Sequence, residues 1–510
     1  MNDMGSSLES SHNENYVADD QPTVSARVFK GAIWVAGGNI GIRLIGFANT
    51  LIVARLLAPD DFGVVAIGVT LTQLIQNFSD IGVSRAVIRF DQAGRREFDT
   101  LFTLSFLRGV LVSAVILILS VFASGMFGDP RVGPIFAAMA LYAFIQCLYN
   151  PKFYEFEREI SFRQETMVMA VEKVVMVVVS VAIAYFFRSF WAIVSSLIVG
   201  AVIRLGMTYA MRPYLPRFGL AAVGTLISFT GWLTALGAVV ALNNKLSPLI
   251  VGKLLGPTLT GLFTVGSTVA YLPGSDIADP AARALFPGLA SLKNDSGKMR
   301  DALLFGVAAL STVAIPLSIA FALMADDLVL LLLGPQWGDA ALVVQVYAPT
   351  VGITCVFAVV TDYAVAQGKA KQAFVRELAY LILQLPVFIW ATAFYGYIGA
   401  VWASAFCGLL HAGSNAWLYT SLTKKGVLDL FKAVSRPLAA AFMMVVGVTV
   451  FQRSGLTNSC AVLIRLAAEG AVAAAVLCSS IYGLWAIAGK PYGPETKIAQ
   501  LLHRGRLNGN

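Results

Sequence analysis

Charged residues are scarce in this chain of 510 residues. Only 13% are Asp, Glu, Lys or Arg and 57% are apolar, and the mean hydropathy is +0.74. A soluble globular protein carries about 25% charged residues, so this composition excludes a soluble enzyme and a disordered chain. The apolar residues form long runs instead of alternating with polar ones, which excludes a membrane β-barrel. We therefore predict an all-α polytopic membrane protein.

Histidine and cysteine are also few. The five cysteines are scattered with no C-x-x-C pair, and the three histidines, His12, His411 and His503, are far apart. Neither pattern predicts a disulfide framework, a metal site or a cofactor. The net charge of +8 fits cationic cytoplasmic loops, so we expect no nucleic-acid partner.

Apolar segments follow one another from residue 28 onward. Each has about the 20 residues that a membrane helix needs, and together they predict about 14 transmembrane helices. The predicted spans are 29–53, 62–87, 101–124, 132–149, 167–187, 190–211, 226–251, 258–285, 302–324, 339–366, 374–394, 397–420, 433–451 and 464–488. Residues 1–27 are polar and resemble no signal peptide, so we expect a disordered cytoplasmic tail.

The distribution of Lys and Arg predicts the orientation. With the N-terminus in the cytoplasm, the loops assigned inside carry 24 of the 37 cations and those assigned outside carry 5. This split follows the positive-inside rule. We predict that both termini are cytoplasmic.

The chain contains an internal duplication at an offset of 198 residues. Residues 51–59 (LIVARLLAP) align with 249–257 (LIVGKLLGP), and Gly63 aligns with Gly261. An even number of spans separates the copies, so both enter the membrane in the same direction. Such a parallel repeat is typical of a transporter with two lobes and a substrate site between them.

The repeat divides the chain into two pseudo-symmetric six-helix lobes and an extra helix pair. The predicted parts are a tail at 1–27, the N-lobe at 28–217, the C-lobe at 218–425, the extra pair at 426–488 and a cytoplasmic tail at 489–510. Within the repeated motif, we expect Pro59 to end the first hairpin turn and Asp60 or Asp61 to cap the next helix. Gly63 is expected to let helices approach closely.

Several segments resemble a known transporter family. They are Lys30-Gly31-Ala32-Ile33-Trp34, the stretch Ala54-Arg55-Leu56-Leu57-Ala58-Pro59-Asp60-Asp61-Phe62-Gly63, residues 156–163 and residues 366–369. Over residues 28–425 the chain resembles the polysaccharide transporter branch of the multidrug/oligosaccharidyl-lipid/polysaccharide (MOP) superfamily, in particular Wzx-type flippases for exopolysaccharide or colanic-acid-like units.

The resemblance implies a flippase in the bacterial inner membrane. Its cargo would be an undecaprenyl-pyrophosphate-linked oligosaccharide repeat unit for exopolysaccharide or lipopolysaccharide synthesis, moved by alternating access and coupled to an ion. Besides membrane lipid, a polysaccharide polymerase and a chain-length regulator are the partners implied. No catalytic residue is expected.

A pyrophosphate crossing the membrane needs a wet, cationic pocket. Ionisable residues inside spans are costly and so mark candidate sites. Arg43 lies in the middle of the first span, and Lys245 lies in its repeat-related counterpart beside Asn243 and Asn244. With Arg204 of the sixth span, these residues are the predicted substrate-binding set.

Four acids are candidates for ion coupling: Asp80, Glu172, Asp276 and Asp279. Asp276 and Asp279 follow Pro273 and Gly274, where an unwound helix could bind H⁺ or Na⁺. Pairing with nearby cations is the alternative reading. Four tyrosines are candidates for stacking on sugar: Tyr149, Tyr154, Tyr271 and Tyr363.

Two other functions remain open from the sequence. A lipid II flippase or a drug or metabolite:ion antiporter would share the architecture, although a drug exporter is expected to expose acids rather than Arg43 and Lys245. A membrane-bound polymerase or ligase would need a long external loop with catalytic residues. The predicted external loops are short, so we expect no enzyme.

Overall fold

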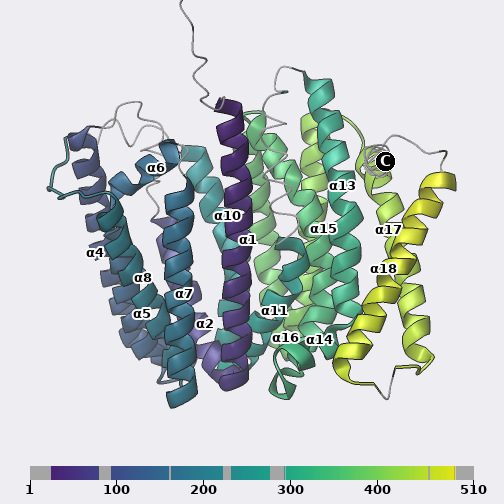
Figure 1. Cartoon of the computed structure of the whole chain (residues 1–510), viewed down its shortest axis with the longest axis horizontal. Helices are drawn as coiled ribbons and strands as arrows, with labels where there is room; N and C mark the ends of the chain where they lie inside the picture. The colour runs from purple at the N-terminus through teal and green to yellow at the C-terminus, as the bar shows by residue number, and fades with distance from the viewer. Residues whose placement is uncertain are drawn as a thin grey trace, which may run out of the picture.

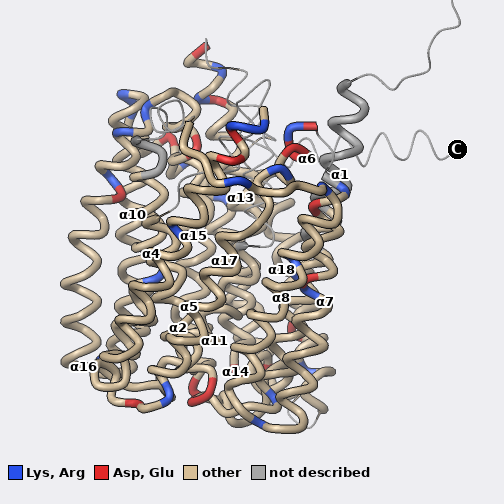
Figure 2. The backbone as a smooth tube through the Cα atoms, turned by 90° about the vertical axis from the view of Figure 1, so that its left-hand side faces the viewer, with Lys and Arg blue, Asp and Glu red and all other residues tan. Residues whose placement is uncertain are grey.

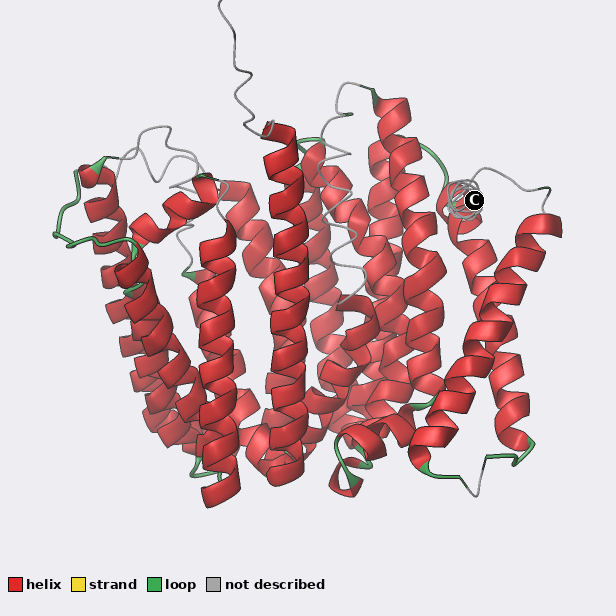
Figure 3. Cartoon of the chain, viewed as in Figure 1, coloured by secondary structure: helices red, strands yellow, loops and turns green. Residues whose placement is uncertain are grey.

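A computed structural model describes residues 24–79, 94–159, 162–221, 231–275, 292, 295–457, 460–487 and 489. In these residues the secondary structure is helical, without strands, and the long helices stand side by side (Figures 1 and 3). Nine of them are long and apolar enough to cross a membrane, or ten if one bent pair counts as a span. The all-α membrane fold is confirmed, and the count of 14 spans stays a prediction.

The N-lobe helices lie on one side of the molecule, with α1 in front of the middle (Figure 1). Their bounds are α1 Val24–Leu56, α2 Pro59–Phe78, α4 Arg95–Phe127, α5 Val132–Cys147, η1 Pro151–Tyr154, α6 Glu155–Arg158, α7 Phe162–Phe187 and α8 Trp191–Met211. A core of buried Val, Ile, Phe and Met side chains joins α2, α4, α5 and α8. The chain bends by 59° between α5 and the η1–α6 segment.

The C-lobe helices and the extra pair form the other side of the molecule (Figure 1). Their bounds are α10 Gly231–Leu255, α11 Pro257–Ser275, α13 Ser296–Leu323, α14 Ala325–Leu332, η2 Pro335–Trp337, α15 Ala340–Ala366, α16 Ala370–Thr423, α17 Leu428–Arg453 and α18 Val462–Ile487. The predicted external loop 325–338 therefore contains two short helical segments, α14 and η2.

The 54-residue α16 is bent into two arms at Gly396. A straight helix of that length would measure about 80 Å, far more than the roughly 30 Å hydrocarbon core. Gly396 has φ 62° and ψ −141°, and a Cβ added to Gly399 would lie 2.0 Å from the Ala391 carbonyl oxygen. The two arms agree with the predicted spans 374–394 and 397–420.

The extra helix pair packs on the outside of the C-lobe. α17 lies against α13, and α18 lies against α17 at the edge of the molecule (Figure 1). Arg465 of α18 forms an ion pair with Asp327 of α14. Pairing of Arg465 with Glu469 one turn away is the simplest expectation from sequence, but the Arg465 guanidinium reaches a neighbouring helix instead.

Candidate functional site

The repeated motif forms the contact between the two lobes. A Cβ added to Gly63 would lie 1.7 Å from the Pro257 carbonyl oxygen, and one added to Gly261 would lie 1.9 Å from the Pro59 carbonyl oxygen. Each glycine therefore packs on the repeat-related proline of the other lobe. This reciprocal geometry is what a two-fold relation between the copies produces, and it confirms that the motif serves close helix approach.

Two repeat-related cations strengthen this contact in the same reciprocal way. Arg55 donates to the carbonyl oxygens of Leu331 and Leu332 at the C-terminus of α14. Lys253 donates to the carbonyl oxygen of Met126 at the C-terminus of α4. Each cation thus reaches the negative end of a helix dipole in the opposite lobe. Gln336 and Trp337 of the C-lobe also donate hydrogen bonds to the Ala54 carbonyl oxygen of the N-lobe.

Asp60 and Asp61 both lie in the first turn of α2, as predicted, and Asp60 also joins the lobes. The N-cap residue of α2 is Ala58, which makes no side-chain capping bond. Asp60 accepts a hydrogen bond from Thr258, its own repeat counterpart, at 3.0 Å, and pairs with Arg131. Arg131 also binds Asp129 at 2.6 Å in the same loop, and this hydrogen bond holds the pKa of the Asp129 carboxyl below its usual value. We call the set Arg55, Asp60, Gly63, Lys253, Thr258 and Gly261 the inter-lobe contact.

Substituting Gly63 by Ala tests the packing of the inter-lobe contact. The added methyl group would overlap the Pro257 carbonyl oxygen, so we expect a loss of about 1–3 kcal/mol in the free energy of unfolding. Gly237→Ala is the matched control, because a Cβ there meets nothing within 4 Å and alanine favours a helix. Thermal unfolding of the purified protein should show a lower midpoint for Gly63→Ala alone. Equal midpoints would contradict the close approach.

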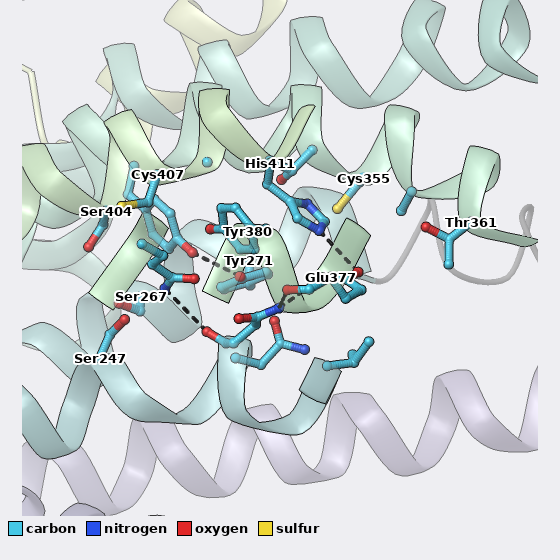
Figure 4. Close-up of a pocket in the computed structure, with 18 of the residues that line it drawn as sticks. Ser247, Ser267, Tyr271, Cys355, Thr361, Glu377, Tyr380, Ser404, Cys407 and His411 are labelled. Atoms are coloured by element: carbon cyan, nitrogen blue, oxygen red, sulfur yellow. Dashed lines mark hydrogen bonds and ion pairs between the residues drawn. The ribbon is translucent and has the colours of Figure 1, made fainter. Parts of the chain in front are cut away.

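A cavity of about 460 Å³ lies in the C-lobe, between α10, α11, α15 and α16. Figure 4 shows Tyr271 and Tyr380 near its centre, with Ser267 on one side and Glu377 on the other. The residues that line it include Asn243, Asn244, Ser267, Tyr271, Glu377, Tyr380, Gln384 and His411.

The deepest charges at this cavity form a hydrogen-bonded cluster. The Glu377 carboxylate lies 3.0 Å from the Arg376 guanidinium and 3.3 Å from the His411 ring, and it accepts a 2.8 Å bond from the Asn243 amide. Arg376 also donates to Thr361. Arg376 and Glu377 are only 1% and 4% exposed, so the two charges compensate one another away from solvent. We call Arg376, Glu377, His411 and Asn243 the buried cluster.

The sequence-based reasoning missed most of the buried cluster. Arg376 is one of the 24 Lys and Arg residues assigned to cytoplasmic loops from the sequence, but in the structure it is buried within α16. Glu377 and His411 lie within the predicted spans 374–394 and 397–420. The rule that an ionisable residue inside a span marks a candidate site would have selected both.

The predicted substrate-binding residues are distributed over both lobes. Asn243 is buried and Asn244 exposed on the wall of the C-lobe cavity. Arg43 on α1 and Lys245 on α10 are half-buried, and neither lines this cavity. Their place in a central cationic pocket stays a prediction.

Arg204 and Glu172, predicted for different roles, are partners in the N-lobe. The Arg204 guanidinium lies 3.4 Å from the Glu172 carboxylate and 5.0 Å from the centre of the Tyr149 ring. This pair joins α8 to α7. The other three predicted coupling residues, Asp80, Asp276 and Asp279, lie outside the described residues.

Comparison with known proteins identifies the family. A family model described as "Polysaccharide biosynthesis protein" matches residues 52–342. The lipopolysaccharide biosynthesis protein WzxC of Escherichia coli is 23% identical over 62% of this chain and 66% of its own length. The succinoglycan biosynthesis transport protein ExoT of Rhizobium meliloti is 22% identical over 69% and 72%. The teichuronic acid biosynthesis protein TuaB of Bacillus subtilis is 21% identical over 96% and 100%.

Solved structures show the fold. The lipid II flippase MurJ in an inward closed conformation superposes with a TM-score of 0.69 at 12% identity, covering 89% of this chain and 99% of that one. A multidrug resistance MATE transporter of the MOP superfamily gives a TM-score of 0.60 at 12% identity over 75% and 96%. The family model spans more than half of the chain, and the fold is similar to that of these two transporters. This chain belongs to the polysaccharide biosynthesis protein family and has the transporter fold of the MOP superfamily.

Proposed function

We propose that this protein is an inner-membrane flippase for undecaprenyl-pyrophosphate-linked oligosaccharide repeat units in bacterial polysaccharide synthesis. The observation that carries the proposal is the match of a polysaccharide biosynthesis family to a two-lobe transporter fold. The relatives WzxC, ExoT and TuaB are named for three different polysaccharides, so a shared lipid-linked precursor chemistry accounts for them better than one common sugar.

The positions of Arg43 and Lys245 support an anionic cargo. Both lie inside membrane helices that the duplication relates to one another, and both are half-buried. A guanidinium suits the oxygens of a phosphate and stays charged when partly dehydrated. In this proposal the two cations, with Arg204 as a further candidate, receive the pyrophosphate headgroup while the polyprenyl tail stays in lipid.

The lobes are proposed to rock against one another and to part at the inter-lobe contact when the outer side opens. The beginning of α1 and the end of α18 lie at the same end of the molecule, opposite the end where α1 meets α2 (Figure 1). Charged residues also gather at the end where α1 begins (Figure 2). With both termini cytoplasmic, the inter-lobe contact faces outward and closes the outer side until the cargo is released.

An ion gradient is proposed to bias this equilibrium. Asp80, Glu172, Asp276 and Asp279 remain candidates for coupling, and the buried cluster adds Glu377, a further carboxylate inside a membrane helix. A polymerase and a chain-length regulator are the proposed partners that consume the exported units.

Replacing Arg43 and Lys245 together by Ala tests the cationic headgroup site. We expect a loss of polysaccharide export of more than tenfold, since removing two charge-assisted phosphate contacts weakens binding by about 1.5–3 kcal/mol each. Exported polysaccharide and lipid-linked repeat units accumulated inside the cell are measured together with protein abundance in the membrane.

Lys432→Ala is the matched control for this pair, because Lys432 is an exposed cation on α17. Export should stay normal in the control. Normal export from the Arg43/Lys245 double variant at unchanged abundance would overturn the cationic site.

A further inference from the structure

We propose that the cavity inside the C-lobe binds a neutral sugar ring of the transported oligosaccharide, an inference that rests on the proposed function. The cavity is separate from Arg43 and Lys245, which do not line it. It would therefore recognise the sugar part of the cargo, while the diphosphate is held elsewhere.

Three polar atoms on the cavity wall have no hydrogen-bond partner in the protein. They are Asn243 Oδ1, Gln384 Oε1 and Ser267 Oγ. Asn243 and Gln384 are only 9% and 6% exposed. An unsatisfied buried polar atom costs about 1–3 kcal/mol, so these atoms are matched to a ligand that presents several hydroxyl groups.

The helix that carries Asn243 adds another acceptor. Pro248 lies inside α10 and on the cavity wall. Because proline has no N–H, the carbonyl of Asn244, four residues earlier, loses its helical donor. Interrupted helices of this kind commonly build substrate sites in transporters.

The charge balance favours a neutral ligand over a cation. The Glu377 carboxylate is already compensated by Arg376 and also contacts His411 and Asn243. Asp362, the other acid on the wall, has an interaction partner as well. Over the described ranges, no group of three His, Cys, Asp or Glu is placed to hold a metal ion.

Aromatic rings on the wall suit the apolar face of a sugar. Tyr380 lies 4.7 Å from the His411 ring, centre to centre, and the Tyr271 hydroxyl is 2.8 Å from that of Tyr347. Tyr271 and Tyr380 lie close together in the middle of the cavity (Figure 4). Aromatic walls with a few fixed polar groups are typical of small-molecule sites.

Size and access also fit a sugar. The volume of about 460 Å³ falls in the range of roughly 300–1,000 Å³ typical of ligand pockets. Asn244 and Tyr271 on the wall are exposed, and their helices, α10 and α11, pack on α2 of the other lobe. A headgroup between the lobes could therefore place a sugar ring into the C-lobe.

Sugar binding can be measured on the purified full-length protein, independently of transport. Neutral hexoses and N-acetylhexosamines are added at millimolar concentrations, and the thermal unfolding midpoint is followed, since a ligand that binds only the folded state raises it. We expect at least one sugar to raise the midpoint of the unsubstituted protein. The double variant Ser267→Ala/Gln384→Leu should bind that sugar about tenfold more weakly.

Thr264→Val is the matched control. Thr264 also carries a buried hydroxyl without a partner on α11, but it does not line the cavity. Its response to sugar should equal that of the unsubstituted protein. A second arm of the experiment measures the unfolding midpoint in NaCl and in choline chloride, to test whether Na⁺ stabilises the protein instead of sugar.

Three outcomes would overturn the assignment: no response to any sugar in the panel, an unchanged response in the double variant, or stabilisation by Na⁺ in place of sugar. A protein that exports polysaccharide but binds no sugar contradicts the cavity assignment alone. A protein that binds sugar but exports no polysaccharide contradicts the proposed function alone.

Discussion

A disulfide bond between the two lobes is expected to stop export completely. The substitutions are Asp60→Cys and Thr258→Cys, at repeat-related positions whose side chains already meet at 3.0 Å. Side chains that share a hydrogen bond face one another, and a disulfide forms where the two Cβ atoms can come within about 3.5–4.5 Å. If the lobes must part at the inter-lobe contact to release cargo, a covalent link there holds the protein in one state.

The experiment uses a background in which the five native cysteines, none of which forms a disulfide, are replaced by serine or alanine. Cells that carry the double variant should export no polysaccharide after treatment with an oxidant, which forms the disulfide. Adding a reductant should restore export. Asp60→Cys and Thr258→Cys alone are the controls, because each removes the native hydrogen bond without adding a link. Continued export from fully cross-linked protein would show that the lobes do not separate here.

The sequence predicted this contact only in part. Pro59, Gly63 and their copies stand out because the same residues recur at a fixed offset, and a glycine in an apolar helix predicts close approach. The identity of the neighbour could not be predicted, since it depends on how two lobes meet. The same reason explains Asp60, which local rules assign to a helix cap but which binds Thr258 198 residues away.

Hydropathy predicted the membrane helices well and the polar interior poorly. The spans 374–394 and 397–420 agree with the two arms of α16. However, Arg376 lies at the edge of the predicted span 374–394 and counts with the loop cations, although its guanidinium is buried against Thr361 of α15 and His411 of the second arm of α16. The cavity depends on Asn243 of α10 meeting Glu377 of α16, and no spacing in the sequence encodes this long-range pairing.

Removing the Glu377 carboxylate is expected to destabilise the C-lobe strongly. In Glu377→Leu, the Arg376 guanidinium stays buried at 1% exposure without its counter-charge. The Asn243 amide loses an acceptor as well. Breaking a buried ion pair by removing one partner typically costs about 3–5 kcal/mol, so we expect a loss of that size in the free energy of unfolding.

The double variant Arg376→Met/Glu377→Leu separates the ion pair from the rest of the site. Replacing both partners by apolar side chains removes the unpaired charge, so stability should recover by at least half of the loss in Glu377→Leu. Denaturant unfolding of the purified proteins measures this, and protein abundance in the membrane gives a second readout. Equal stability of the single and double variants would mean that Arg376 finds water or another partner, and that the Arg376–Glu377 charges do not hold the cavity wall together. Recovered stability with export still absent would instead assign the carboxylate to the transport cycle, because packing alone would then be restored without function.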